Sequence, residues 1–338
     1  MKYFGTDGFR GEANVTLNVE HAYKVGRFLG NYFQKEDHKV RVVIGKDTRL
    51  SGYMFETALA SGLTASGADV YELHVTTTPS VSYLVRKENF DCGIMISASH
   101  NPYFDNGIKV INGKGHKLEP EIEEQIEKYI DGESEEIPMA KREAIGRCFD
   151  YTKGRDEYIE YLKDLVKEPF DGKTVALDLA NGSASMIAKE IFESMGAQVI
   201  ARHDEPNGTN INRECGSTHI EVLQALVYDT GADIGFAYDG DADRCLAVDD
   251  DGVLGGGHVA AELTVHGVVL QHIGQVIGRT QIVDAHDLDF RVVNGPADHH
   301  TADAAKTVDS NFNTHFKSSP SRWNISNIWY VLYYTLFS

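Results

Sequence analysis

The chain has 338 residues and a formal net charge of −19 at neutral pH, with 42% hydrophobic and 25% charged residues. This is an ordinary globular composition, and the length suggests about two domains. The acidic balance argues against binding to nucleic acid or to an anionic membrane surface, because phosphate groups are held by clustered Lys and Arg. A local basic pocket for one small phosphate is still compatible with this composition.

The four cysteines are scattered and include no Cys-x-x-Cys pair, which favours free thiols in a reducing compartment. The N-terminus has no apolar signal stretch. The most apolar run, residues 325–337, is shorter than the roughly 20 residues needed to span a bilayer. We therefore expect a cytoplasmic protein without a membrane partner.

A break in composition follows residue 254. Residues 1–254 have a charge balance of −17, whereas residues 255–338 contain only one of the 24 Glu residues but 7 of the 14 His residues. Glu and Lys normally cover solvated helix faces, and the last quarter of the chain has few of either. We treat residues 255–338 as an unassigned segment and expect it to fold poorly.

In chain order, short β-branched runs alternate with amphipathic stretches. Before a polar connector at residues 132–138, strands are predicted over residues 40–45, 68–75 and 91–97, and helices over residues 53–66, 78–87 and 119–130. After the connector, helices are predicted over residues 155–167, 183–195 and 219–229, and strands over residues 174–179, 198–202, 234–238 and 245–248. Strands separated by helices indicate parallel crossovers.

These elements predict an α/β fold with two consecutive, mixed and mainly parallel α/β domains, over residues 1–150 and 151–254. The unassigned tail, residues 255–338, follows them. In sheets of this kind, ligands bind beyond the carboxyl ends of the strands. The polar and Gly-rich segments fall at those strand ends, and they contain the candidate functional residues.

Residues 96–102, Ile-Ser-Ala-Ser-His-Asn-Pro, end one buried strand. A serine and a histidine on such a loop can supply a nucleophile and an acid or base, here Ser99 and His100. Neighbouring residues usually point in different directions, so His100 need not be the base that deprotonates Ser99. Taken alone, the segment is more typical of a turn.

Residues 239–244, Asp-Gly-Asp-Ala-Asp-Arg, follow another buried strand. The alternating carboxylates of Asp239, Asp241 and Asp243 repel one another unless a cation lies between them. Oxygen ligands alone favour Mg²⁺ or Ca²⁺ over zinc. An EF-hand calcium loop would need Glu at position 12, counted from Asp239, where this chain has Asp250. The pattern therefore indicates a different metal site or an exposed acidic turn.

Three further segments bring positive charge or glycine to strand ends. In residues 5–11, Gly-Thr-Asp-Gly-Phe-Arg-Gly, backbone N–H groups and Arg10 can approach a phosphate, although these residues alone are more typical of a hairpin turn. Lys109, in Asp-Asn-Gly-Ile-Lys, can hold a phosphate or act as a base, although alone it is more typical of a surface turn. Lys46 and Arg49 have the same two interpretations.

Taken in order, these blocks resemble the α-D-phosphohexomutase superfamily, and their form is most similar to that of the bacterial phosphoglucosamine mutases. The resemblance covers about residues 1–254. It implies that Ser99 is a phosphoserine in the resting enzyme. It also implies one Mg²⁺ per chain, which bridges the phosphoryl group of Ser99 to Asp239, Asp241 and Asp243.

The resemblance assigns roles to four more residues. Arg244 would contact the phosphoryl oxygens, and Arg10 would be the N-terminal active-site arginine. Lys109 would be a general base or a phosphate-steering lysine. His100 would support proton transfer and the geometry of the phosphoserine.

The reaction implied by the resemblance has two phosphoryl transfers. Phospho-Ser99 gives its group to glucosamine 6-phosphate, and the 1,6-bisphosphate then turns over and returns its other phosphoryl group, leaving glucosamine 1-phosphate. The partner is thus a small phosphosugar, with glucosamine or glucose 1,6-bisphosphate as activator. The alternatives are a phosphoglucomutase or phosphomannomutase and, from another class, a non-catalytic Mg²⁺-binding remnant.

The sequence departs from the superfamily after residue 254. Members have four domains, of which the third carries a sugar-recognising Gly-Glu-x-Ser-Gly-His loop and the fourth an Arg-x-Ser-Gly-Thr phosphate clamp. Neither motif occurs in this sequence. We expect a chain truncated or frameshifted near residue 255. Without the clamp, the binding energy that positions the substrate would be lost, so we expect very low or no mutase activity.

Overall fold

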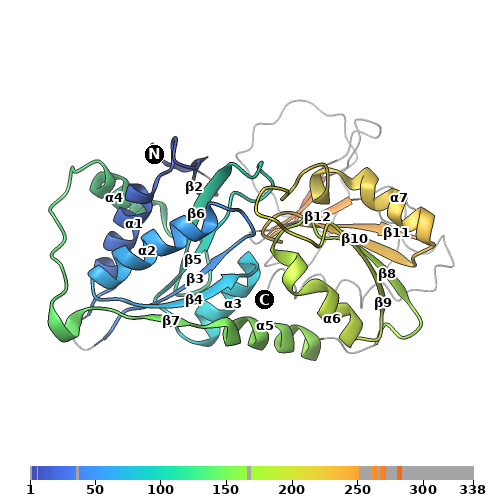
Figure 1. The fold of residues 1–338 in the computed structure, drawn as a ribbon, viewed down its shortest axis with the longest axis horizontal. Helices are drawn as coiled ribbons and strands as arrows, with labels where there is room; N and C mark the ends of the chain where they lie inside the picture. Colours follow the sequence, from blue (N-terminus) through green and yellow to red (C-terminus); the bar gives the residue numbers. More distant parts are fainter. Residues whose placement is uncertain are drawn as a thin grey trace.

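The computed structural model describes residues 2–5, 7–35, 38–165 and 169–250, together with the backbone of three later strands. Two α/β domains lie one beside the other along the longest axis of the molecule (Figure 1). The α/β fold with two consecutive mixed domains is confirmed. Among the described residues, every helix is too short or too polar to cross a bilayer.

The first sheet has seven strands in the order β1-β2-β6-β5-β3-β4-β7. They are β1 (Phe4–Gly5), β2 (Gly8–Glu12), β3 (Arg41–Lys46), β4 (Asp69–Val75), β5 (Cys92–Ile96), β6 (Asp105–Asn112) and β7 (Cys148–Asp150). Strands β5, β3, β4 and β7 are parallel neighbours, whereas β1, β2 and β6 add to the sheet in antiparallel pairs. On the antiparallel side, β1 is followed by β2 and β5 by β6 without an intervening helix.

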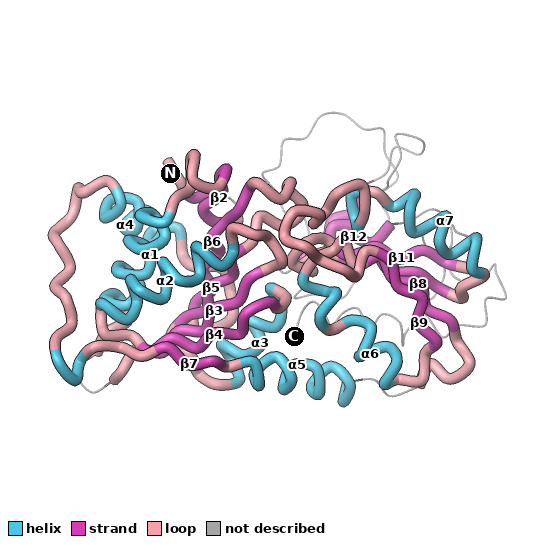
Figure 2. The backbone as a smooth tube through the Cα atoms, viewed as in Figure 1, coloured by secondary structure: helices cyan, strands magenta, loops and turns pink. Residues whose placement is uncertain are grey.

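Helices cover both faces of this sheet. They are α1 (Val19–Tyr32), α2 (Gly52–Ala65), α3 (Thr78–Lys87) and α4 (Pro120–Ile130), with a short 3₁₀ turn at Arg142–Ala144. Helices α1, α2 and α4 pack on one face and α3 on the other. Residues on both sides of each central strand are therefore buried, which explains the continuous apolar runs in the sequence. The connector from α4 to β7 runs along the outer edge of the domain (Figure 2).

The second sheet has four strands in the order β11-β10-β8-β9. They are β8 (Thr174–Asp178), β9 (Gln198–Arg202), β10 (Ile234–Tyr238) and β11 (Cys245–Asp249). Helices α5 (Thr152–Leu165) and α6 (Ala188–Ser194) cover one face, and α7 (Ile220–Thr230) covers the other. Two 3₁₀ turns, Ser183–Met186 and Gly216–Thr218, precede α6 and α7. Over the two sheets, five of the nine strand pairings are parallel.

A third sheet is formed by β12 (Ala260–Thr264), β13 (Gly267–Gln271) and β14 (Thr280–Val283), which pair antiparallel in sequence order. Strand β12 lies against β11 of the second domain. The rest of the segment beyond residue 250 lies outside the described residues, as does the expectation that residues 255–338 fold poorly.

Most predicted elements lie within three residues of their observed bounds, and two differences matter for the site. The helix predicted over residues 183–195 is interrupted at Ile187, where a 3₁₀ turn ends before α6 begins. Residues 105–109, typical of a surface turn, instead begin strand β6. An Asp-Asn-Gly start resembles a turn in sequence, but here pairing with β2 and β5 extends it.

Candidate active site

The serine loop, residues 97–102, connects β5 to the segment that leads into β6. Ser99 is buried and has a φ of 53°, a left-handed conformation that is uncommon outside glycine. Its N–H donates to Ser97 Oγ at 2.9 Å. Its carbonyl accepts hydrogen bonds from Arg49 Nη2 at 2.9 Å and from Asn212 Nδ2 at 2.8 Å. Three side chains therefore fix the backbone of this serine.

Arg49 is the main internal support of the serine loop. The side chain is fully buried, and its Nε donates to Asp47 Oδ2 at 2.8 Å. Its two Nη atoms donate to the carbonyls of Ser99, Asn101 and Pro102. A planar guanidinium can reach several carbonyls at once, which explains why a buried Arg is stable at this position.

The acidic loop, residues 239–244, joins β10 to β11. One carboxylate oxygen from each of Asp239, Asp241 and Asp243 lies within 4.8 Å of the others, and the first two residues are buried. Burial, followed by the charges of Asp243 and Asp241, raises the pKa of Asp239 well above its usual range. Crowded, buried carboxylates of this kind are stabilised by a nearby cation.

The serine loop and the acidic loop meet through their side chains. The Ser99 hydroxyl donates a hydrogen bond to Asp239 Oδ2. Lys109 Nζ, from β6, lies 2.6 Å from Asp241 Oδ2 and 2.8 Å from Asp243 Oδ2. The first domain thus supplies a hydroxyl and a cation, and the second domain supplies the carboxylates that they contact.

The charges of Lys109 and its partners are strongly coupled. Burial alone would lower the pKa of Lys109, but the charges of Asp241 and Asp243 raise it above its usual range. In turn, Lys109 lowers the pKa of Asp243 against the effect of burial. Lys109 is therefore held as a cation between the two carboxylates.

His100 and Arg10 lie at the edge of this junction. His100 Nδ1 is 3.0 Å from Arg244 Nη1. Burial, followed by the charges of Arg244 and Arg10, lowers the pKa of His100, so a neutral ring can accept a hydrogen bond from the guanidinium. Arg10 lies on β2, packs against Gly107 of β6 and forms its ion pair with Asp7 at 3.2 Å. Arg10 therefore stands beside the serine loop.

The acidic loop has the donors that a hard divalent cation requires. Its three carboxylates supply oxygen ligands alone, the preference of Mg²⁺ rather than of zinc. Among the described residues, the buried Oδ1 atoms of Asp241 and Asp243 have no hydrogen-bond partner. These two orphaned oxygens and the raised pKa of Asp239 show that the residues present fit such an ion.

Thr78 and Asn212 contact the two loops but were missed in the sequence. Thr78 begins α3; its N–H donates to the carbonyl of Asp241 at 3.0 Å, and its hydroxyl donates to the carboxylate of the same residue. The Thr-Pro pair predicts the start of a helix, but nothing in it indicates the contact with the acidic loop. Asn212 lies in a polar loop whose composition is that of any surface turn, so only the packing of the two domains reveals its position.

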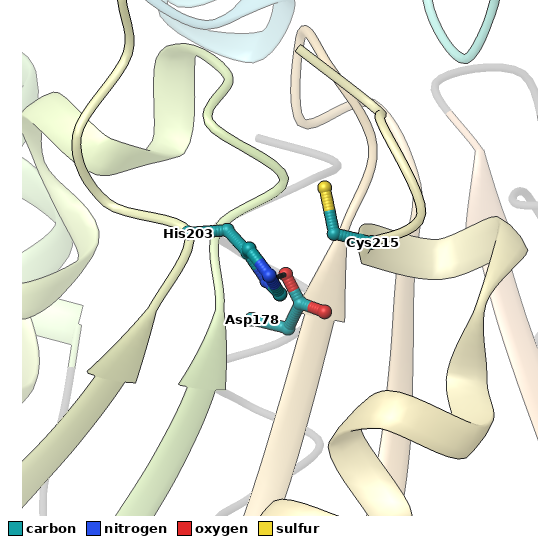
Figure 3. A group of neighbouring side chains, drawn as sticks. All are labelled: Asp178, His203 and Cys215. Atoms are coloured by element: carbon teal, nitrogen blue, oxygen red, sulfur yellow. Dashed lines mark hydrogen bonds and ion pairs between the residues drawn. The ribbon is translucent and has the colours of Figure 1, made fainter. Parts of the chain in front are cut away.

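A second group of potential ligands lies in the second domain, where Asp178, His203 and Cys215 come within 4.8 Å of one another (Figure 3). Asp178 Oδ1 accepts from the N–H of Ala180 at 3.1 Å and lies 3.0 Å from His203 Nδ1, and Oδ2 accepts from the N–H of Gly216 at 2.9 Å. Burial, with a further contribution from Asp178, raises the pKa of the Cys215 thiol to about 12. The hydrogen bonds of Asp178 tie together three chain segments.

The serine loop of one α/β domain and the acidic loop of a second α/β domain thus define one candidate site. Residues 1–137 match the family model described as phosphoglucomutase/phosphomannomutase, alpha/beta/alpha domain I, and residues 156–252 match domain II of the same family. The chain belongs to the phosphoglucomutase/phosphomannomutase family.

Named relatives agree with this family. The chain is 68% identical over 251 residues to a phosphoglucosamine mutase of Lachnoclostridium phytofermentans, which covers 74% of this chain and 56% of the relative. It is 58% identical over 280 residues to one of Lachnospira eligens, covering 82% of this chain and 62% of the relative. The chain thus spans little more than half the length of these relatives.

A solved structure shows the same fold. A phosphoglucomutase/phosphomannomutase family protein from Burkholderia thailandensis matches with a TM-score of 0.65 and 28% identity. The match covers 75% of this chain and 55% of that protein. The similarity therefore extends over both described α/β domains.

Proposed function

We propose that this chain carries the phosphoryl-accepting half of a phosphoglucosamine mutase site, with Ser99 as the nucleophile. The observation that carries this proposal is the hydrogen bond from the Ser99 hydroxyl to Asp239, which joins the two domains through residues 140 positions apart. This bond places the Ser99 oxygen directly beside the carboxylates of the acidic loop, as a nucleophile at a metal-assisted phosphoryl-transfer site requires.

The same site would hold Mg²⁺ through Asp239, Asp241 and Asp243, with an oxygen of phosphorylated Ser99 as a further ligand. When bound, the ion would neutralise the charge that builds up on a phosphoryl group in transfer. Lys109 would balance the remaining carboxylate charge and steer the phosphate towards Ser99. Its contacts with Asp241 and Asp243 support this role.

The proposed step transfers one phosphoryl group from a sugar bisphosphate to Ser99. A bond forms between Ser99 Oγ and phosphorus while the bond between phosphorus and the sugar oxygen breaks. Ser99 Oγ gives up its proton as its bond to phosphorus forms, and the sugar oxygen takes up one proton and leaves as a hydroxyl, so the protons balance. Arg244 and Arg10 would contact the phosphoryl oxygens, and neutral His100 would help to orient Arg244.

The experiment that tests this proposal measures phosphorylation of the purified chain. After incubation with glucose 1,6-bisphosphate and Mg²⁺, intact mass spectrometry should show one added phosphoryl group, and peptide mapping should place it on Ser99. Ser99→Ala should abolish the addition, whereas Ser194→Ala, at the exposed end of α6, should leave it unchanged. An unphosphorylated wild-type chain that still binds Mg²⁺ would favour the non-catalytic remnant instead.

We further propose that the complete interconversion of glucosamine 6-phosphate and glucosamine 1-phosphate is very slow in this chain. The names of the relatives support the choice of sugar, and the absence of the two later motifs from the sequence supports the low rate. Because the sugar-recognising motif is absent from this sequence, the sugar is tested in a chain completed with the later domains of a full-length relative, which should turn over glucosamine 6-phosphate faster than glucose or mannose 6-phosphate. The opposite order would indicate a phosphoglucomutase or phosphomannomutase. Turnover by the present chain as fast as that of a full-length relative would contradict the low rate.

A further inference from the structure

The carbonyl of Ser99 is held from both domains at once. Arg49 Nη2 reaches it from the first domain at 2.9 Å, and Asn212 Nδ2 reaches it from the second at 2.8 Å. The same two side chains also donate to the carbonyl of Asn101, Arg49 at 2.8 Å and Asn212 at 3.1 Å. Neither bond belongs to regular secondary structure, and together they converge on a serine whose φ is 53°.

Asn212 is itself firmly placed by the second domain. Its N–H donates to the carbonyl of Ala180 at 2.9 Å, directly after β8. Asp178, also at the end of β8, accepts the N–H of Ala180 and of Gly216, at 3.1 and 2.9 Å, and lies 3.0 Å from the His203 ring. The loop over residues 203–216 is thus anchored near both of its ends by one buried carboxylate (Figure 3).

The amide of Asn212 also lies against the acidic loop. A Cβ added at Gly240 would be 3.0 Å from Asn212 Nδ2 and 2.6 Å from the Ser99 carbonyl oxygen. The side chain of Asn212 therefore occupies the seam where the serine loop and the acidic loop touch. A displacement of this amide would disturb the approach of Ser99 to Asp239.

The geometry points to Asn212 as a positioning residue, which holds Ser99 in its left-handed conformation and so couples the placement of the second domain to the orientation of the nucleophile. This inference rests on the proposed role of Ser99 as phosphoryl acceptor. A left-handed backbone at a non-glycine residue is sustained only when its surroundings determine it. Arg49 supplies that restraint within the first domain, and Asn212 supplies it across the domain boundary.

Two substitutions separate the amide from the backbone at this position. Asn212 has a φ of 56°, which glycine adopts without strain, so Asn212→Gly removes only the amide. Asn212→Asp keeps the shape but places oxygen against two carbonyl oxygens. Asn14 is the matched control, because it is an exposed asparagine with a φ of 63° on the first domain, and Asn14→Gly and Asn14→Asp repeat the same changes there.

The measurement is the rate of Ser99 phosphorylation by glucose 1,6-bisphosphate with Mg²⁺ as a function of bisphosphate concentration. We expect the maximal rate to fall about fivefold in Asn212→Gly, the scale of the lost hydrogen bond to the Ser99 carbonyl, and at least about tenfold in Asn212→Asp. The bisphosphate concentration at half-saturation should stay unchanged, because the proposed role of the amide is to hold the serine loop and not to bind the bisphosphate. The Asn14 variants should match wild type in both constants.

The outcomes distinguish the two proposals. A wild-type chain that is not phosphorylated contradicts the proposed function itself. A phosphorylated wild type with Asn212 variants of equal maximal rate overturns the positioning role. If Asn212→Asp lowers the thermal midpoint, the inference is tested by the maximal rate of Asn212→Gly at a temperature where this variant and wild type are both folded. A change confined to half-saturation also counts against the inference.

Discussion

The serine loop, residues 97–102, and the acidic loop, residues 239–244, meet at one site, yet they are held by different interactions. Arg49 and Asp47 form a buried ion pair, and the other donors of Arg49 go to carbonyls of the serine loop. The acidic loop instead holds three neighbouring carboxylates, and it obtains Lys109 from the other domain. The serine loop thus contacts a buried cation of its own domain, whereas the acidic loop depends on a cation from the other domain.

The largest expected effect is the loss of that cation. Lys109→Met should lower the free energy of unfolding in Mg²⁺-free buffer by about 3–5 kcal/mol, because removing one partner leaves buried charges uncompensated. Added Mg²⁺ should restore part of the loss, measured by urea unfolding with and without the ion. A Lys109→Met chain as stable as wild type in Mg²⁺-free buffer would show that the acidic loop does not depend on Lys109.

Arg49→Lys tests the other side of the comparison. An ammonium group cannot reach the several acceptors of the guanidinium, so we expect a loss of about 2–3 kcal/mol. Here Mg²⁺ should restore nothing, because the lost bonds are to backbone carbonyls and to Asp47. Arg27→Lys is the matched control for a buried arginine, since Arg27 bonds to Ser66 far from the site and its substitution should leave Ser99 phosphorylation unchanged. If Mg²⁺ restored the free energy of unfolding of Arg49→Lys, the proposed difference between the serine loop and the acidic loop would be wrong.

Gly240→Ala probes the contact between the two loops. The added methyl would meet the Ser99 carbonyl oxygen at 2.6 Å, and neither backbone can move easily. We expect a loss of about 1–3 kcal/mol, as for other overpacked sites, together with slower phosphorylation of Ser99. Gly5→Ala is the stability control, because its nearest neighbouring atom is 3.9 Å away. Equal unfolding midpoints for the two variants would mean that the loops are free to separate.

The smallest expected effect is a gain. The pKa of Asp239 in the folded chain is raised above its unfolded value of about 3.9. The free-energy cost of its buried negative charge is therefore absent below the unfolded pKa and grows as the pH rises towards the folded pKa. Asp239→Asn should therefore stabilise the Mg²⁺-free chain by about 1 kcal/mol at neutral pH, and the gain should vanish near pH 3. Urea unfolding across this pH range would detect it, and a loss of stability at neutral pH would contradict the sign.

The sequence indicated the candidate residues that directly follow strands better than those that lie within a strand or in a distant loop. Ser99 and the three aspartates follow buried strands, and strand ends can be recognised from local patterns of apolar residues. The strand that carries Lys109 was missed because its first residues resemble a turn. Arg49 was ambiguous, since the same Lys-Asp-Thr-Arg pattern suits a surface loop.

Asn212 could not be predicted for a physical reason. Its partners, the carbonyls of Ser99 and Asn101, lie more than 110 residues away in sequence. Local propensity describes only the turn in which it lies. Its contact depends on how two separately folded sheets dock, and no pattern within either domain encodes that arrangement.

The hydrogen bond between Ser99 and Asp239 has a kinetic consequence. It joins residues 140 positions apart, so the chain must close a very long loop before the bond can form. Contacts of such high sequence separation form slowly compared with helices and local strand pairs. We therefore expect both sheets to assemble first and the junction to form late in refolding. The Thr78 amide donates to the carbonyl of Asp241 across this junction, so its protection from hydrogen exchange would then mark the completion of folding.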